Sequence, residues 1–186
     1  MRLKKANACL SILSMICLLA HISTCVYSYI AFIYMPGPIR ATADSAAVFI
    51  TVHAFISLYL VFCRGDGFRI DRYPRQNIRT HIQRIAALAI LLMLIPHFKA
   101  FGILMYMQTT GQADNLKLFM LSEAVFYALV ILHIAVSFSK ALITFGVITS
   151  EQAIKKTDRI VYVIAIIIYI IAVYSILKTQ TLMFIG

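Results

Sequence analysis

Residues 128–140 read ALVILHIAVSFSK and place a histidine, His133, in the middle of an apolar run. The run continues on both sides and is long enough to cross a bilayer core, which takes roughly 20 apolar residues in a helix. A titratable ring is costly at such a depth and tends to be functional. The stretch therefore predicts a transmembrane helix with a candidate site inside it.

The whole chain has the composition of a membrane protein. Of its 186 residues, 62% are hydrophobic and 13% are charged, and the mean hydropathy is +0.90. Soluble domains are apolar over only about half of their residues. We find no repeat or second domain, so residues 1–186 are expected to form a single transmembrane domain. The first apolar stretch is longer than a signal-peptide core and is interpreted as a retained span.

Five apolar stretches qualify as spans, and they cover residues 8–34, 45–63, 82–108, 118–146 and 159–178. The segments between them contain charges, prolines or glycines. Because every backbone amide inside a bilayer needs a partner within its own element, the spans are predicted to be α-helices. The predicted fold is an all-α integral membrane protein, a bundle of five transmembrane helices.

The basic residues set the predicted orientation, because lysine and arginine concentrate on the cytoplasmic side of membrane proteins. Of the 17 lysines and arginines, only Arg40, Lys99, Lys117 and Lys178 fall on the side opposite the N-terminus. The N-terminus is therefore expected in the cytoplasm and the C-terminus outside. The net charge of +10 is interpreted as a topology signal and a docking surface, and no nucleic acid is expected as a partner.

Four histidines lie one each in the first four predicted spans: His21, His53, His97 and His133. A single intramembrane histidine is most often an interhelical hydrogen-bonding residue, but four in four helices favour a shared site. Neutral imidazole is a common ligand of heme iron, and helix bundles build such sites from facing helices. Counting depth at about 1.5 Å per residue suggests two levels, with His21 and His97 nearer the outside and His53 and His133 nearer the cytoplasm.

Small side chains follow three of these histidines by one helical turn, at Cys25, Ser57 and Ser137. They would leave room for a flat cofactor beside each ring, although small residues also help membrane helices to pack. Pro96 is expected to bend the third span. The four cysteines lack the close spacing of a metal pair and are interpreted as packing residues.

Several pieces of the chain, in this order and spacing, resemble a known family. The pieces are RLKKANACLSILSMICLLAH (2–21), VHAFISLYLVF (52–62), HIQRIAALAILLMLIPH (81–97) and LHIAVSFSKALITFGVITSEQ (132–152). Together they resemble the single-chain, five-span cytochrome b anchor of succinate:quinone oxidoreductases, the menaquinone-linked type with two hemes b. The resemblance covers nearly the whole chain.

The resemblance implies that the outer histidine pair ligates a distal heme and the inner pair a proximal heme. It places Gln83 and Arg84 at the membrane edge, where Arg84 would pair with a heme propionate. It also implies a bacterial cytoplasmic membrane, a membrane quinone, and two soluble partners on the cytoplasmic side, an FAD-containing flavoprotein and an iron–sulfur subunit. The loop RGDGFRIDRYPRQNIRT (64–80) would belong to the docking surface, and the dicarboxylate chemistry would lie on the partners.

Two other functions stay open at this point. One is a diheme cytochrome b anchor of another quinone-linked enzyme, a hydrogenase or a formate dehydrogenase. The other is a heme-free structural anchor in which the histidines only pack between helices.

Two charged residues are candidates for a quinone site. Glu123 lies ten residues before His133, which places it roughly 15 Å nearer the outside, and Lys99 lies two residues beyond His97. Quinone reduction takes up two protons, so a quinone site needs groups that pass protons. The alternative is that Glu123 lies among the headgroups and that Lys99 snorkels outward.

Overall fold

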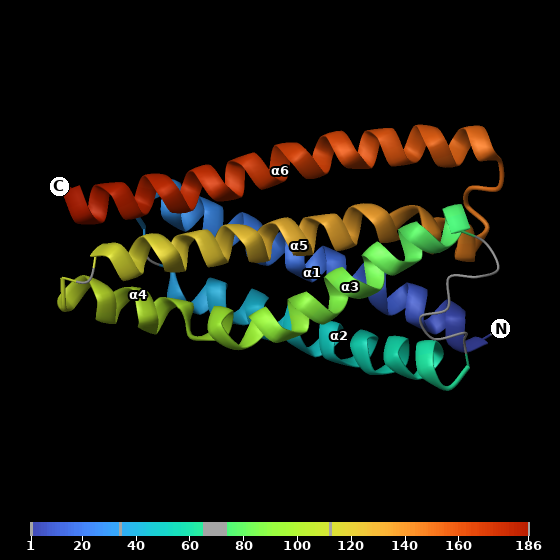
Figure 1. Cartoon of the computed structure of the whole chain (residues 1–186), viewed down its shortest axis with the longest axis horizontal. Helices are drawn as coiled ribbons and strands as arrows, with labels where there is room; N and C mark the ends of the chain where they lie inside the picture. The colour runs from blue at the N-terminus through green and yellow to red at the C-terminus, as the bar shows by residue number, and fades with distance from the viewer. Residues whose placement is uncertain (1, 34, 65–73, 112, 186) are drawn as a thin grey trace.

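The computed structural model describes residues 2–33, 35–64, 74–111 and 113–185. Within them the chain forms six α-helices and no strand (Figure 1). Five of these helices are long and apolar enough to cross a membrane, so the prediction of an all-α bundle with five spans is confirmed. The helices are α1 (Arg2–Ala31), α2 (Pro36–Phe62), α3 (Pro74–Phe98), α4 (Ala100–Thr109), α5 (Ala113–Phe145) and α6 (Glu151–Ile185).

The helices extend beyond the predicted spans because local signals, and not the apolar pattern, set their ends. α2 begins at Pro36, and proline suits the first turn because its missing N–H has no partner there anyway. Before α6, the Ser150 hydroxyl accepts a hydrogen bond from the Ala153 N–H at 3.2 Å and caps the helix. α5 ends at Phe145, and the next residue, Gly146, has a φ of +75°, which suits glycine. The Gly146 and Val147 amides close that end with two backbone bonds of 3.0 Å.

The third predicted span, 82–108, differs most from the structure. It is divided between α3 and α4, which meet at Lys99. Pro96 cannot donate a backbone hydrogen bond, and three residues later the Lys99 N–H bonds to the Pro96 carbonyl at 3.1 Å in a tighter turn. Figure 1 shows α4 running at an angle to α3. The predicted bend is therefore present, and it ends α3 at Phe98.

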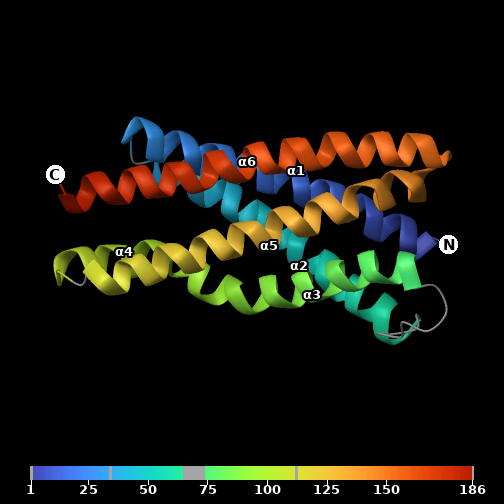
Figure 2. The same ribbon diagram turned by 45° about the horizontal axis from the view of Figure 1, so that its top comes forward.

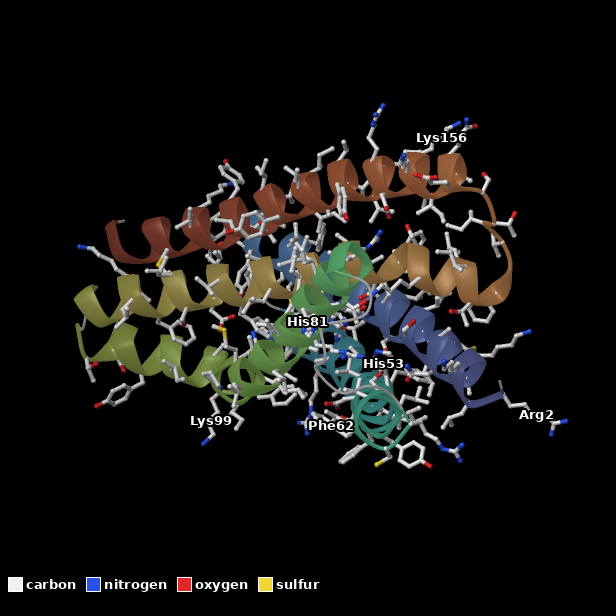
Figure 3. The ribbon with its side chains drawn as sticks, turned by 45° about the vertical axis from the view of Figure 1, so that its right-hand side comes forward. Arg2, His53, Phe62, His81, Lys99 and Lys156 are labelled. Carbon is white, nitrogen blue, oxygen red and sulfur yellow. The ribbon has the colours of Figure 1, made fainter. Side chains whose placement is uncertain are left out.

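The long helices alternate in direction, and the two chain termini lie at opposite ends of the bundle (Figures 1 and 2). We call the end where α1 begins the N-terminal end. The start of α3 and the connection between α5 and α6 lie there too, and Figure 3 shows Arg2 and Lys156 at this end. The basic residues of several segments thus gather on one side, as the orientation argument requires.

Helix packing divides the bundle into two parts. α1 packs closely on α2, and α5 packs on α3 and α6. α1 also contacts α5 and α6, which joins the two parts. In the described part of the chain, α2 packs closely on α1 alone. α2 and α3 therefore make no close backbone contact over the described residues.

Small residues make up much of the interior, beside larger ones such as Phe126 and Ile176, and many large apolar residues face outward. The side chains of Phe55, Leu92 and Val163 are 70%, 75% and 54% exposed, which suits contact with lipid chains. Membrane helices associate through small residues because lipid gives no hydrophobic drive for burying large ones. The buried small residues include Ala46, Ala86, Ala135, Ala141, Ser139 and Ser175.

An ion pair fastens three helices together at the N-terminal end. Arg79 of α3 donates through its two terminal nitrogens to the Asp158 carboxylate of α6, at 2.7 and 2.8 Å. Its Nε donates to the Val136 carbonyl of α5 at 3.0 Å, and the Ser139 hydroxyl of α5 donates to the same carboxylate. Such a bidentate pair has a fixed geometry, so it sets how α3, α5 and α6 align.

We predict that Asp158→Ala destabilises the bundle by roughly 2 kcal/mol, because Arg79 would lose both bonds to the carboxylate while its own side chain stays partly buried. A fully buried ion pair would cost more to break, but the side chains of Arg79 and Asp158 both keep some exposure. Asp44→Ala, which breaks the exposed pair between Arg40 and Asp44, is the matched control and should leave the melting temperature unchanged. Thermal unfolding of the detergent-solubilised protein measures both. Equal melting temperatures for the two variants would contradict the role of Asp158.

Candidate functional site

His21 of α1 and His97 of α3 lie next to each other in the bundle. Their ring centroids are 6.4 Å apart, and the ring planes are nearly perpendicular at 87°. Two imidazoles that share one metal ion at about 2 Å per metal–nitrogen bond have centroids roughly 6 Å apart. The observed separation therefore fits two rings that face a common metal, although these residues are far apart in the sequence.

His97 is held by a carboxylate. Its Nδ1 lies 2.8 Å from Oε2 of Glu123 on α5, and Glu123 is buried, with 3% of its surface exposed. The Phe126 ring stacks beside the imidazole at 4.6 Å between centroids. When Nδ1–H donates to the carboxylate, the lone pair of Nε2 is left for another partner, which is the arrangement of metal-bound histidines.

His21 has small polar neighbours on two helices. The Cys25 Sγ atom, one turn further along α1, lies 3.7 Å from Nε2 and 3.9 Å from Nδ1. The Thr42 hydroxyl of α2 lies 3.4 Å from Nδ1. Cys25 thus contacts the ring that the sequence analysis placed it beside, and a larger residue at this position would occupy the space around the imidazole.

His133 of α5 is held by a main-chain group. Its Nδ1–H donates to the Gln83 carbonyl of α3 at 3.0 Å. This bond fixes the tautomer that leaves Nε2 as the ring atom with a lone pair. His133 and His97 are therefore tethered in the same way, one by a peptide carbonyl and the other by a carboxylate.

His53 of α2 faces into the bundle (Figure 3). Its Nδ1 is buried and has no hydrogen-bond partner among the described residues, and its Nε2 lies 3.5 Å from the Ser57 hydroxyl one turn away. Buried polar atoms are nearly always paired, so an orphaned nitrogen indicates a missing partner. His53 and His133 are close enough for a charge on one ring to act on the other, as expected for residues at one level.

Cations gather on the N-terminal side of the pair formed by His53 and His133. The Lys140 ammonium donates to the Gln83 side-chain oxygen at 2.7 Å and to the Thr80 hydroxyl at 2.9 Å. Arg79 and Arg84 lie within electrostatic reach of this ammonium. Gln83 and Arg84 were predicted as site residues, whereas Lys140 was assigned only to the topology signal. Its spacing of seven residues, two turns, from His133 puts both on one helix face and could have identified it.

A hollow of about 260 Å³ lies between α2 and α3. Its lining is almost entirely apolar, and it includes residues on both sides of His53 in the sequence. An apolar hollow of this kind suits a hydrophobic ligand, and His53 is not among the residues that line it. The lining residues are Ile50, Thr51, Ala54, Phe55, Leu58, Leu91 and Leu94.

The two predicted quinone residues have different surroundings. Lys99 is exposed at the junction of α3 and α4 and projects from the bundle (Figure 3), where it lines an open hollow of about 450 Å³ together with Tyr106. Glu123 is buried against His97, and no ion pair in the described part of the chain joins it to Lys99. Glu123 therefore lies inside the bundle and not on its surface.

The donor set consists of two pairs of imidazoles on opposing helices. No group of three or more His, Cys, Asp and Glu residues with metal-site geometry occurs among the described residues, but heme iron in a bis-histidine site needs only two protein ligands. The residues present fit that requirement, since two rings are tethered through Nδ1 and a third has an orphaned nitrogen.

No protein-family model, curated protein or solved structure matches the chain.

Proposed function

We propose that this protein is the membrane anchor and electron-transfer subunit of a quinone-linked dehydrogenase of the succinate:quinone oxidoreductase type, and that it binds two hemes b. The observation that supports the proposal best is the arrangement of the four histidines. The four come from four helices, and the rings of His21 and His97 lie 6.4 Å apart between centroids, with nearly perpendicular planes. The sequence resemblance supplies the enzyme class.

His21 and His97 would hold the distal heme, and His53 and His133 the proximal heme. Bound hemes supply one-electron transfer, which no amino-acid side chain of this chain offers. The protein orients the imidazoles: Glu123 and the Gln83 carbonyl would accept hydrogen bonds from the Nδ1–H groups of two rings.

The cations near the proximal pair would bind heme propionates. Arg84 was predicted for this role, and Lys140 lies within electrostatic reach of it. Carboxylates bind strongly to charged donors in surroundings of low dielectric constant. The existing bond from Lys140 to Gln83 would then help to hold the segment of α3 that carries the His133 acceptor.

The two levels of histidines would connect the two sides of the membrane. Electrons from the cytoplasmic partner would enter near the proximal pair, and the quinone, menaquinone by resemblance, would react near the distal pair. Lys99 is at the outer level and lines an open hollow, which supports its place near a quinone. Glu123 contacts His97. A direct role of Glu123 at the quinone stays a prediction.

The soluble partners, a flavoprotein and an iron–sulfur subunit, would bind at the N-terminal end of the bundle. Exposed cations of α1 and α6 gather at this end, with Arg2 and Lys156 visible in Figure 3. Basic surface also fits the cytoplasmic side of a bacterial inner membrane. Most of the loop predicted to dock the partner, residues 65–73, lies outside the described residues.

We expect the purified complex to contain two low-spin hemes b. His53→Ala and His133→Ala should each remove one heme, and His21→Ala and His97→Ala should remove the other, because each heme would lose one of its two axial ligands. His81→Ala, a histidine outside both pairs, is the control and should retain both hemes. The pyridine hemochrome assay, divided by protein content, measures the heme ratio.

A heme-to-protein ratio near zero in the intact wild-type complex would refute the proposal. Loss of the same heme from His53→Ala and His21→Ala would keep the hemes but show that the histidines are paired wrongly. The spectra of the remaining heme in each variant distinguish these cases.

We expect the N-terminus in the cytoplasm and the C-terminus outside, because the basic residues concentrate at the N-terminal end. Green fluorescent protein folds in the cytoplasm and stays dark when exported through the Sec pathway. A fusion at the N-terminus should therefore fluoresce, and a fusion at the C-terminus should be dark at equal expression. The reverse pattern would contradict the orientation.

We expect a flavoprotein and an iron–sulfur subunit to co-purify with the anchor in mild detergent, and succinate to reduce its hemes. Basic surface at the N-terminal end supplies the physical reason for a soluble partner on that side. Mass spectrometry of the intact complex measures subunits and hemes together. An anchor that purifies alone, or with the subunits of a hydrogenase or a formate dehydrogenase, would contradict the assignment.

A further inference from the structure

Glu123 is a buried acid whose charge is not balanced by lysine or arginine in the described part of the chain. Its side chain is 4% exposed, and its Oε2 lies 2.8 Å from His97 Nδ1. A carboxylate that is buried without a partner is strongly destabilising. The position of Glu123 therefore depends on its bond to His97 and on its side-chain hydrogen bond with Tyr127.

The residues around Glu123 form a cradle for the His97 ring. Glu123, Phe126 and Tyr127 lie on one face of α5, at the spacing of one helical turn. Phe126 stacks beside the imidazole at 4.6 Å and 30° between planes, and Tyr127 meets it at 6.2 Å and 83°. Three side chains of one turn thus fix the position and the tilt of this ring.

The bond between Glu123 and His97 has two possible donors. If the imidazole N–H donates, Nδ1 is protonated and Nε2 keeps a lone pair. If the carboxyl O–H donates to Nδ1, the ring proton lies on Nε2, which then cannot bind a metal ion. His97 can therefore act as an Nε2 ligand when Glu123 accepts the hydrogen bond, and cannot when Glu123 donates it.

The second tethered histidine lacks such a charge. His133 donates to the Gln83 main-chain carbonyl at 3.0 Å, and that acceptor is neutral. The side chain of the same Gln83 accepts a hydrogen bond from a cation, the Lys140 ammonium, at 2.7 Å. The two tethered histidines therefore differ in the charge of their acceptors.

We infer that Glu123 is a positioning residue for His97, which selects the ligating tautomer and lowers the midpoint potential of the heme bound there. A carboxylate acceptor makes an imidazole a more basic ligand, and its negative charge favours oxidised over reduced iron. The inference deepens the proposed function and rests on it, because Glu123 acts only through His97.

Two substitutions separate the charge from the hydrogen bond. Glu123→Gln keeps a side-chain oxygen that accepts from Nδ1–H but removes the charge. Glu123→Leu removes both, and loss of such a supporting group lowers metal affinity by about 10- to 100-fold. Glu123→Asp keeps the charge on a shorter side chain. Glu151→Gln is the matched control, since Glu151 is an exposed acid paired with Lys155.

Redox titration of the purified complex, followed by heme absorbance, tests the inference. Glu123→Gln should retain both hemes, and the midpoint potential of one of them should rise clearly more than that of the other. Glu123→Asp should shift that potential less, and Glu151→Gln should shift neither. Glu123→Leu should leave the complex with fewer than two hemes per protein after purification.

The His97→Ala background assigns the effect to the correct heme. There the remaining heme should keep its potential when Glu123→Gln is added. Unchanged potentials in Glu123→Gln, or equal shifts of both hemes, would overturn the inference while leaving the hemes in place. A wild-type complex without heme would instead overturn the proposed function, so the two failures are distinct.

Discussion

Every imidazole inside the bundle needs a partner for its ring nitrogens, and this constraint links helices that are distant in the sequence. α3 is tied to α5 at two levels, by the bond from His97 to Glu123 and by the bond from His133 to the Gln83 carbonyl. An unmade hydrogen bond is costly where no water competes. The register of α3 against α5 therefore determines how the two candidate ligands His97 and His133 are oriented.

The rest of the bundle supports this register. Alanine and serine residues let the helices approach, and the Arg79–Asp158 pair aligns α3, α5 and α6 at the N-terminal end. α2 differs because it packs closely on α1 alone among the described helices. A hollow of about 260 Å³ is left between α2 and α3.

The sequence allowed the spans and the helix break to be predicted, because each depends on local features: apolar length and Pro96. The two histidine levels stay a prediction. Contacts such as Cys25 against His21 follow from one helical turn within a single helix. The partners of Glu123 and Lys140 could not be predicted. They depend on how α5 is rotated and shifted against α3, which no local pattern encodes, and both charges had simpler explanations in the sequence.

The central claim is that the four histidines form two bis-imidazole heme sites. Low-temperature electron paramagnetic resonance of the oxidised, purified complex tests this claim most directly, because it reports the ligand field of each ferric iron. The account predicts two distinct low-spin ferric signals of similar intensity. A high-spin ferric signal as the main species, or no heme signal in a complex of proven integrity, would contradict it.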